Sequence, residues 1–325
     1  MNRSVIMDNE KKNSFYGITD IGQAEELLNL FRRDHPNDIV GAENMLQELL
    51  EVLLAPETKL TGTATDFHNF SVSITRITND NRNALAIVKE GLKIHACDTD
   101  LLADALRYGY NCGEKEECET LYKRLQSIDK SSWTWRAFSF SIDYLIGIYS
   151  SDRVHSFSVE DILKLAQEYK ENQPDEEDAW LSEQEIYAKT NQPEKGIKVL
   201  EEAMEKFSSC PRCWLRYADI MMDKGEYEKA EPVIKKMRRD PKTSEAINSS
   251  YMFYLDGLCK MRRLINSDEY DEGEVDPKEV LRVYKAFQLS LASPGLRENT
   301  KRNIEEQINR LSTETDIEYP QEWRV

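Results

Sequence analysis

The cysteine pair in Cys210-Pro211-Arg212-Cys213 is the one short motif of this sequence whose spacing is typical of metal or redox chemistry. Two cysteines separated by two residues can supply half of a zinc site or a dithiol redox pair. A closed zinc site needs two more ligands, and no second Cys-x-x-Cys motif or matching histidine pair follows. Because both cysteines fall where two expected helical units join, we interpret them as small buried packing residues. The sequence alone leaves a metal or redox role for them undecided.

A second group of potential ligands combines His95 and Cys97 with Cys112 and Cys118. These four residues span the boundary between two expected helical units. Cys118 falls at a position where a small residue packs between helices, which favours a structural role. We therefore predict no metal at this place either.

The histidines of the chain fall in no catalytic motif; they are His35, His68, His95 and His155. No motif matches any of them to a Ser or Cys nucleophile. The sequence also has no glycine-rich phosphate loop and no His-Glu-x-x-His pattern. We expect a protein that is not an enzyme and that carries no metal and no cofactor.

The charge of the chain disfavours some classes of partner, and its hydropathy bears on its location. The chain has 325 residues and a formal net charge of −17 at pH 7, which disfavours nucleic acid and anionic membrane surfaces because both are negatively charged. No apolar run approaches the roughly 20 residues that span a bilayer. The polar segment Met1–Lys12 lacks the apolar block of a secretory signal. We therefore expect a cytoplasmic protein whose six cysteines are reduced thiols.

The elements that carry these residues are helices, and residues 178–241 hold two copies of one helical unit. Trp180 and Trp214 are separated by the length of one unit, and each opens an apolar helical pattern. After Trp214, aromatic, small and aliphatic residues follow at regular offsets: Tyr217, Ala218, Met221, Gly225, Tyr227, Ala230 and Ile234. The copy that starts at Trp180 keeps Tyr187, Leu200 and Ala203, with Asn191 at the Gly position and Gly196 at the Ala position.

This pattern resembles the tetratricopeptide repeat, whose period is roughly 34 residues and which places a large residue, small residues, a turn glycine, an aromatic residue and a packing alanine at these offsets. The same frame continues towards the N-terminus. Gly113 marks the turn between helices expected at residues 101–110 and 116–125. One period earlier, a helix over Phe67–Ile77 precedes a second helix lined by Ala84, Val88 and Leu92.

The predicted fold is all-α: a right-handed superhelical solenoid of the tetratricopeptide type, with about seven helical pairs and a C-terminal capping helix. We expect a disordered N-terminus over residues 1–19, a divergent first helical pair over 20–64, the repeat array over 65–292, and the capping helix and tail over 293–325. A DNA-binding helix-turn-helix is the alternative for residues 22–54. It is disfavoured because that segment has almost no surplus of Lys or Arg for phosphates.

The unit that starts at Trp133 departs from the frame. Its first helix is long and aromatic up to Tyr149, and roughly ten extra residues precede Ser158, which is expected to cap the next helix together with Asp161. One helix cannot bury six large rings on a single stripe, so some of them are expected to reach the concave surface or a partner. Later in the chain, the pattern predicts a long helix over residues 244–265, an acidic loop over 267–276, and a helix that begins at Asp276-Pro277.

The resemblance also implies where a partner binds, because the first helices of tetratricopeptide pairs line a concave groove that holds an extended peptide or a helix. It assigns partner binding to the following residues: Arg107, Tyr110, Trp135, Phe138, Arg212, Leu215, Arg216 and Asp219. The arginines among them can grip carboxylates in a bidentate manner. Members that bind chaperone tails use a Lys and Asn set. The expected groove positions contain no Asn, and Lys189 is their only Lys. This argues against binding of a chaperone tail in the groove.

Two hypotheses follow for function. The first is a non-enzymatic adaptor or scaffold that binds a protein or peptide segment of basic or mixed charge in the groove. The second is a regulatory subunit or inhibitor that acts on a partner enzyme through acidic surface. It rests on residues 171–188, with seven carboxylates, and 268–276, with six, because neither stretch contains a Lys or Arg. A peptide-sensing transcription regulator would need a DNA-binding head that residues 22–54 do not resemble. The sequence leaves the partner's identity, the process and self-association open.

Overall fold

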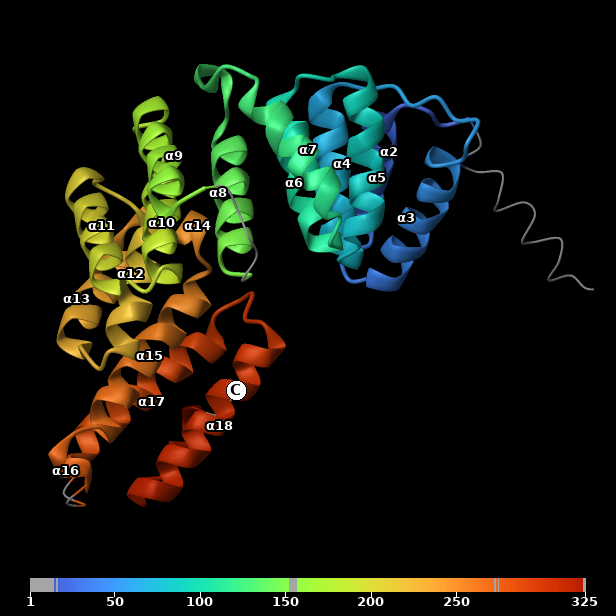
Figure 1. Cartoon of the computed structure of the whole chain (residues 1–325). Coiled ribbons are helices and arrows are strands. Elements are labelled where there is room, and N and C mark those ends of the chain that lie inside the picture. Colours follow the sequence, from blue (N-terminus) through green and yellow to red (C-terminus); the bar gives the residue numbers. More distant parts are fainter. Residues whose placement is uncertain (1–14, 16, 152–156, 272, 274, 324–325) are drawn as a thin grey trace, which may run out of the picture. The chain divides into compact units, whose positions relative to one another are not determined.

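The computed structural model describes residues 15, 17–151, 157–271, 273 and 275–323, and α-helices dominate this part of the chain (Figure 1). Two 3-10 turns and one isolated bridge between Asp20 and Thr61 complete its regular structure. His155 and most of the N-terminal segment for which disorder was predicted lie outside the described residues.

The helices are packed in consecutive pairs, and α18 (Glu298–Thr315) follows the last pair. Two short helices, α14 (Pro241–Ala246) and α16 (Asp268–Asp271), lie outside the pairing. The pairs are α2 (Ile21–Asp34) with α3 (Ile39–Leu53), α4 (Ala64–Thr78) with α5 (Asn81–Ile94), α6 (Thr99–Cys112) with α7 (Lys115–Gln126), α8 (Trp135–Tyr149) with α9 (Val159–Asn172), α10 (Glu177–Lys189) with α11 (Pro193–Lys206), α12 (Pro211–Asp223) with α13 (Tyr227–Arg239), and α15 (Ser249–Ile265) with α17 (Pro277–Ala292). Seven pairs and a final helix in the described residues confirm the predicted all-α repeat.

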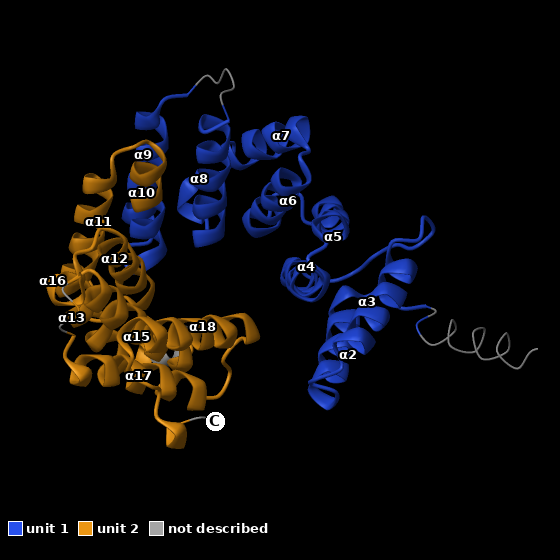
Figure 2. Ribbon diagram, turned by 90° about the horizontal axis from the view of Figure 1, so that it is seen from below, with its two compact units in different colours: residues 1–182 blue, residues 183–325 orange. Residues whose placement is uncertain are grey.

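The chain divides into two compact units, residues 1–182 and 183–325, which are coloured separately in Figure 2. In the first unit, consecutive first helices pack against each other, α2 on α4, α4 on α6 and α6 on α8. In the second unit, α13 packs on α15, and α15 packs closely on α17. The domain limits expected from the sequence, at residues 19, 64 and 292, stay predictions.

The turns inside the pairs follow the predicted repeat frame. Gly113 and Gly225 end α6 and α12 with φ angles of 79° and 76°, in the left-handed region that favours glycine. Asn191, placed at the glycine position from the sequence, has a φ of 59°. Asn79, which lies one period before Gly113, has a φ of 56° and ends α4. Asparagine is the residue other than glycine that most readily adopts this conformation, so the frame is confirmed at all four turns.

The predicted irregularity after Trp133 is also present. Gly147, one period after Gly113, is not a turn, because α8 continues to Tyr149. A Cβ atom at Gly147 would overlap the hydroxyl of Tyr110, so the glycine permits close packing of α6 on α8. The next helix, α9, begins after a capping box in which Ser158 and Asp161 exchange hydrogen bonds, as the sequence predicts.

The prediction of one long helix over residues 244–265 is confirmed for residues 249–265 and is wrong for its start. The structure has α14 and α15 there, separated at Ile247 and Asn248. The Asn248 side chain accepts a hydrogen bond from the backbone N–H of Ser250 at 2.9 Å, which makes Asn248 the N-cap of α15. Local capping therefore outweighs the continuous apolar pattern.

Buried polar pairs join the first helices of the first unit. His68 Nδ1 of α4 lies 2.5 Å from Asp104 Oδ2 of α6, and Asp104 is almost fully buried. Burial raises the pKa of the Asp104 carboxyl, against the hydrogen bond from His68, which lowers it. One layer earlier, Ser73 of α4 donates a hydrogen bond of 2.8 Å to Glu25 of α2. Polar contacts thus help to fix the register of α2 on α4 and of α4 on α6.

The left-handed turn yields a test of the repeat frame. No atom lies within 4 Å of a Cβ atom built at Gly225, so any cost of a side chain there is conformational. We expect Gly225→Ala to lower the free energy of unfolding by about 1 kcal/mol, and Gly225→Asn to lower it by less. Urea unfolding followed by circular dichroism measures both changes. Equal losses for the two variants would contradict the assignment.

Candidate functional site

Two of the predicted binding residues of the first unit, Arg107 and Trp135, form a row with Phe140 and Arg136 on α6 and α8. The Arg107 side chain is exposed, and its guanidinium lies 4.9 Å from the centre of the Phe140 ring. The Trp135 ring meets Phe140 edge to face at 6.2 Å, and the Arg136 guanidinium lies 4.8 Å from the centre of Trp135. Guanidinium groups stacked on rings keep their N–H edges available for carboxylates.

Two other predicted residues of this unit, Tyr110 and Phe138, lie outside this row. Tyr110 is 42% exposed, and its ring packs edge to face on Tyr144 of α8 at 6.0 Å. Phe138 is fully buried and stacks parallel to Tyr169 of α9 at 4.9 Å. Its assignment to partner binding is therefore wrong, because its ring belongs to the core between α8 and α9. Phe140 of α8 is half-buried, and its ring was not predicted to bind a partner.

An acidic side chain positions the row. Asp100 of α6 accepts hydrogen bonds from the Thr134 hydroxyl and, at 3.4 Å, from Arg136 Nη1. Thr134 is the N-cap of α8, so this contact ties the start of α8 to α6. It also holds the Arg136 guanidinium over the Trp135 ring. The rings of Trp135 and Phe140 are half-buried, so part of each lies at the surface. Contact of these rings with a concave surface or a partner stays a prediction.

The predicted residues of the second unit all project from α12. Arg212 and Arg216 are exposed, and Leu215 is half-buried. Arg216 Nε donates a 3.0 Å hydrogen bond to Gln184 Oε1 of α10, and its Nη2 lies 4.0 Å from Glu185 Oε2. Arg216 is therefore already partly engaged with α10, whereas its exposed edge faces solvent.

Asp219, the fourth predicted residue of α12, lies half-buried beside other charges. Burial, and then the neighbouring carboxylate of Asp223, raise the pKa of Asp219 to about 6, against the lowering effect of Arg216 and Arg262. Arg262 of α15 forms an ion pair of 2.9 Å with Asp223 rather than with Asp219. Among the described residues, no hydrogen bond or ion pair engages the Asp219 carboxyl. It is an acceptor that a donor group of a partner could satisfy.

The cysteine motif packs at the start of the same helix. Cys210 is the N-cap of α12, Pro211 is the first residue of that helix, and both Cys210 and Cys213 are free thiols with no exposed surface. Trp214 and Met221 of α12 are also buried in the core. Within the part of the chain that the structure describes, no group of three or more His, Cys, Asp or Glu side chains could hold a metal ion.

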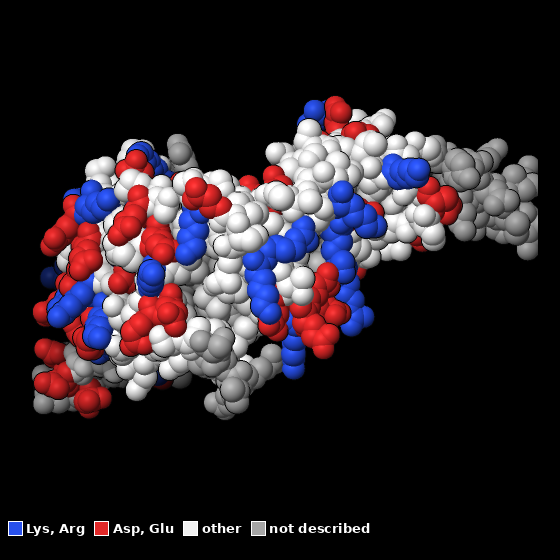
Figure 3. All heavy atoms as spheres, turned by 45° about the horizontal axis from the view of Figure 1, so that its top comes forward, with Lys and Arg blue, Asp and Glu red and all other residues white. Residues whose placement is uncertain are grey.

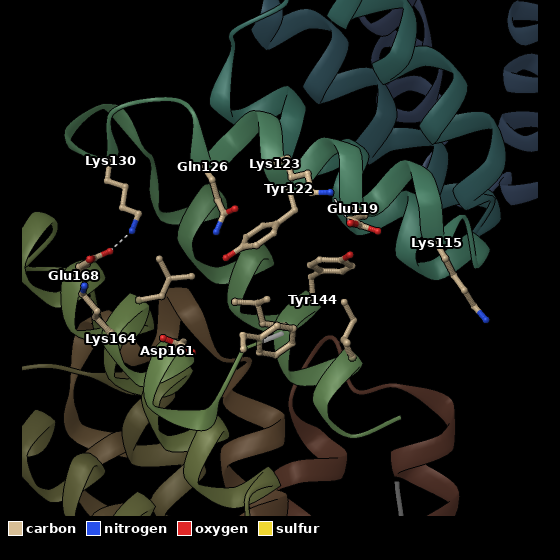
Figure 4. Close-up of a pocket in the computed structure, with 14 residues that line it drawn as sticks. Lys115, Glu119, Tyr122, Lys123, Gln126, Lys130, Tyr144, Asp161, Lys164 and Glu168 are labelled. Atoms are coloured by element: carbon tan, nitrogen blue, oxygen red, sulfur yellow. Dashed lines mark hydrogen bonds and ion pairs between the residues drawn. The ribbon is translucent and has the colours of Figure 1, made fainter. Parts of the chain in front are cut away.

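A cleft that no sequence pattern assigned lies in the first unit between α7, α8 and α9 (Figure 4). Its volume is about 990 Å³. Aromatic and aliphatic side chains of three helices and the loop before α9 line its interior: Tyr122, Tyr144, Leu145, Ile148, Phe157 and Leu165. Lysines and carboxylates form most of its rim: Lys115, Lys123, Lys130, Lys164, Glu119, Asp161 and Glu168. The extra residues before Ser158 are the sequence signal that could have pointed to it.

The described helices pack in consecutive pairs, and left-handed turns recur at Asn79, Gly113, Asn191 and Gly225. The fold is therefore an all-α helical repeat that resembles the tetratricopeptide type. Solved structures with a similar fold include a tetratricopeptide repeat protein from Parabacteroides merdae, with 15% identity over 88% of this chain and 100% of that chain and a TM-score of 0.48. The human IFIT1 dimer with PPP-AAAA has 14% identity over 86% of this chain and a TM-score of 0.49, and the match spans 61% of the IFIT1 chain.

The Naa15/Naa10 complex bound to HypK-THB is a more distant match, with 12% identity over 78% of this chain and 42% of that chain and a TM-score of 0.28. No protein-family model matches the sequence, and no curated protein is significantly similar to it. Likeness at this level concerns the helical arrangement and carries no information on ligands. No described helix combines the length and the apolar character that crossing a bilayer requires.

The environment of Asp219 predicts a pH effect on stability. The pKa of this carboxyl is about 6 in the folded state and about 3.8 when unfolded, so the folded chain binds the proton more tightly. The contribution of Asp219 to stability therefore falls as the pH rises from about 4 to about 6. We expect Asp219→Asn to raise the free energy of unfolding by about 1 kcal/mol at pH 7.5, after allowance for solvent screening.

At pH 4 the same variant should match the parent within error, because Asp219 is then protonated in the folded chain. Thermal melts of both proteins at the two pH values make the comparison, with Asp316→Asn as the control for loss of a carboxylate elsewhere. A stabilisation that is independent of pH would contradict the assignment.

Proposed function

We propose that this chain is a non-enzymatic adaptor that binds a protein or peptide segment along the first helices of its pairs. The observation that carries the proposal is the row formed by Arg107, Phe140, Trp135 and Arg136, which lies exposed or half-buried on α6 and α8. Trp and Arg dominate the energetics of protein interfaces. Here they are held on helices and fixed by the contact of Arg136 with Asp100, so little order has to be gained on binding.

The unsatisfied charges suggest a partner segment of mixed charge. Among the described residues, Arg107 has no carboxylate partner, which favours an acidic group of the partner in the first unit. Asp219 has no donor, which favours a basic or hydroxyl group of the partner in the second unit. This combination agrees with the sequence-based expectation of a basic or mixed-charge partner. The eight predicted residues thus remain a proposal, with Phe140 in the place of Phe138.

The proposal places the protein in the cytoplasm. All six cysteines are free thiols, and four of them, Cys118, Cys210, Cys213 and Cys259, are buried. A protein with many free cysteines suits a reducing compartment. The proposal includes no catalytic role, no cofactor and no direct nucleic-acid partner.

A second candidate function is a regulatory subunit or inhibitor that acts through the acidic segment at residues 268–276. One observation favours it. Arg262 and Arg263 precede this segment, but their ion pairs are made with Asp223 and with Glu231 and Glu279. The described carboxylates Asp268 and Glu269 remain exposed. On the face of the molecule shown in Figure 3, by contrast, acidic and basic side chains are interleaved.

The adaptor proposal is tested by capture of a partner from a lysate of the source organism at high salt, with quantitative mass spectrometry. We expect one stoichiometric protein that is lost on Arg107→Glu combined with Trp135→Ala, and on Arg212→Glu combined with Arg216→Glu. The control combines Lys198→Glu with Arg302→Glu, two exposed sites outside the first helices. Capture that survives both test variants would reject the first-helix faces as the binding site.

The inhibitor alternative predicts a different response to salt. Attraction between exposed charges is screened beyond about 10 Å at 0.1 M salt, so capture through residues 268–276 should fall steeply as salt rises. Replacement of Asp268, Glu269 and Asp271 by their amides should then abolish capture at low salt. Capture that is insensitive to both changes would exclude this alternative.

A further inference from the structure

We propose that the cleft between α7 and α9 is a second binding site, and that it takes an acidic segment of a partner protein with apolar residues at its centre. The inference goes beyond the adaptor function proposed above. None of the residues assigned to the first-helix faces lines this cleft.

The cleft exists because the spacing of the helical pairs is interrupted here. In the first unit, α8 continues past Gly147 to Tyr149, and α9 starts only at Val159. The second helices α7 and α9 are therefore separated by a space whose floor is α8 (Figure 4). Its volume of about 990 Å³ lies at the upper end of the range of about 300–1,000 Å³ typical of ligand pockets.

The floor of the cleft is suited to apolar side chains. The rings of Tyr122 and Tyr144 lie 5.6 Å apart, and the Tyr122 ring projects from α7 into the space. Leu145 and Ile148 of α8 and Leu165 of α9 continue this surface. A partner that offers two or three apolar residues in its middle would cover it.

The carboxylates around the cleft already have partners. Glu119 pairs with Lys123 at 2.6 Å, and Glu168 pairs with Lys130. Asp161 accepts hydrogen bonds from the backbone N–H of Ser158 at 2.7 Å and from its hydroxyl at 3.0 Å. These capping bonds lower the pKa of Asp161, so it stays ionised and engaged. A basic partner would have to displace these contacts.

Two of the described lysines that line the cleft form no such ion pair or hydrogen bond, although Lys164 attracts Asp161 electrostatically. Lys115 and Lys164 are exposed, and among the described residues neither forms an ion pair or hydrogen bond. They lie towards opposite ends of the cleft (Figure 4). Lys115 is also the first residue of α7, where the helix dipole disfavours a cation and favours an anion. The unsatisfied charge of the cleft is thus positive, on a chain whose net charge is −17.

This arrangement favours a peptide over a nucleic acid. A phosphate backbone would bring several negative charges past Glu119, Asp161 and Glu168, which line the same cleft. A peptide with one carboxylate near each end needs only Lys115 and Lys164, and its central side chains meet the apolar floor. Charge complementarity of this kind selects the partner and fixes its register.

The test uses a phage-displayed library of random 16-residue peptides, selected against the full chain at physiological salt. We expect enriched peptides with net negative charge, acidic residues near both ends and apolar residues at the centre. The enriched peptides are then synthesised with a fluorescent label, and their Kd is measured by anisotropy. Lys115→Glu combined with Lys164→Glu should weaken binding roughly tenfold or more, as expected for the reversal of two interfacial charges.

Matched variants separate this site from other effects. Lys59→Glu combined with Lys198→Glu makes the same change in net charge at two exposed positions outside the cleft and should leave the Kd unchanged. Arg107→Glu with Trp135→Ala should also leave it unchanged, which keeps this test independent of the adaptor proposal. Tyr122→Ala, with folding verified by circular dichroism, should weaken binding through loss of the apolar floor.

Several results would overturn the proposal. They are enrichment of basic peptides, no enrichment above background, or an affinity that Lys115→Glu with Lys164→Glu leaves unchanged. Binding of labelled poly(U) RNA that this double variant abolishes, without peptide binding, would assign the cleft to nucleic acid instead.

Discussion

Each helical pair of this chain leaves an apolar face that only a neighbouring pair can cover, and the rest of the structure depends on this constraint. Trp214 is buried in the second unit, and Leu101 and Leu106 are buried in α6, a helix on which both α5 and α8 pack. The series ends where α18 covers α17, with Ile304 and Leu311 fully buried. Hydrophobic stabilisation is thus distributed along the chain in contacts between neighbours rather than concentrated in one core.

Apolar stacking alone does not set the register of neighbouring pairs, and polar contacts between first helices supply it. The pairs Glu25–Ser73, His68–Asp104 and Asp100–Arg136 tie successive layers of the first unit. A carboxylate buried in such a layer is costly unless its partner is in place, so a shifted packing would leave it unsatisfied. The same contacts orient the proposed binding face, because the bond to Asp100 holds Arg136 over the Trp135 ring.

Where the regular stacking is interrupted, a potential binding surface appears. The close contact of Tyr110 with Gly147 keeps α6 and α8 packed, whereas α8 ends at Tyr149 and α9 begins only at Val159. Apolar side chains that a regular pair would have covered then line an open cleft. In the second unit, Asp219 is a comparable exception, since its half-buried carboxyl lacks a partner among the described residues and its pKa is about 6. At both places, side chains that folding has left uncovered or without a partner are accessible at the surface.

The sequence by itself determined the helical pairs, several of their turns and the caps of α9 and α17, because these depend on residues close together in the chain. Asn191 and Gly113 mark turns through their own conformational preferences, and Ser158 and Asp161 cap α9 through a contact three residues apart. Only the tertiary structure decided that Phe138 is buried in the core and that Phe140 is half-exposed. The ring of Phe138 stacks on Tyr169 of α9, and this contact fixes which face of α8 is turned towards the core. The tertiary structure also created the cleft, because the residues that line it come mainly from three different helices. Periodicity specifies which residues are apolar, whereas contacts between distant segments specify which of them remain accessible.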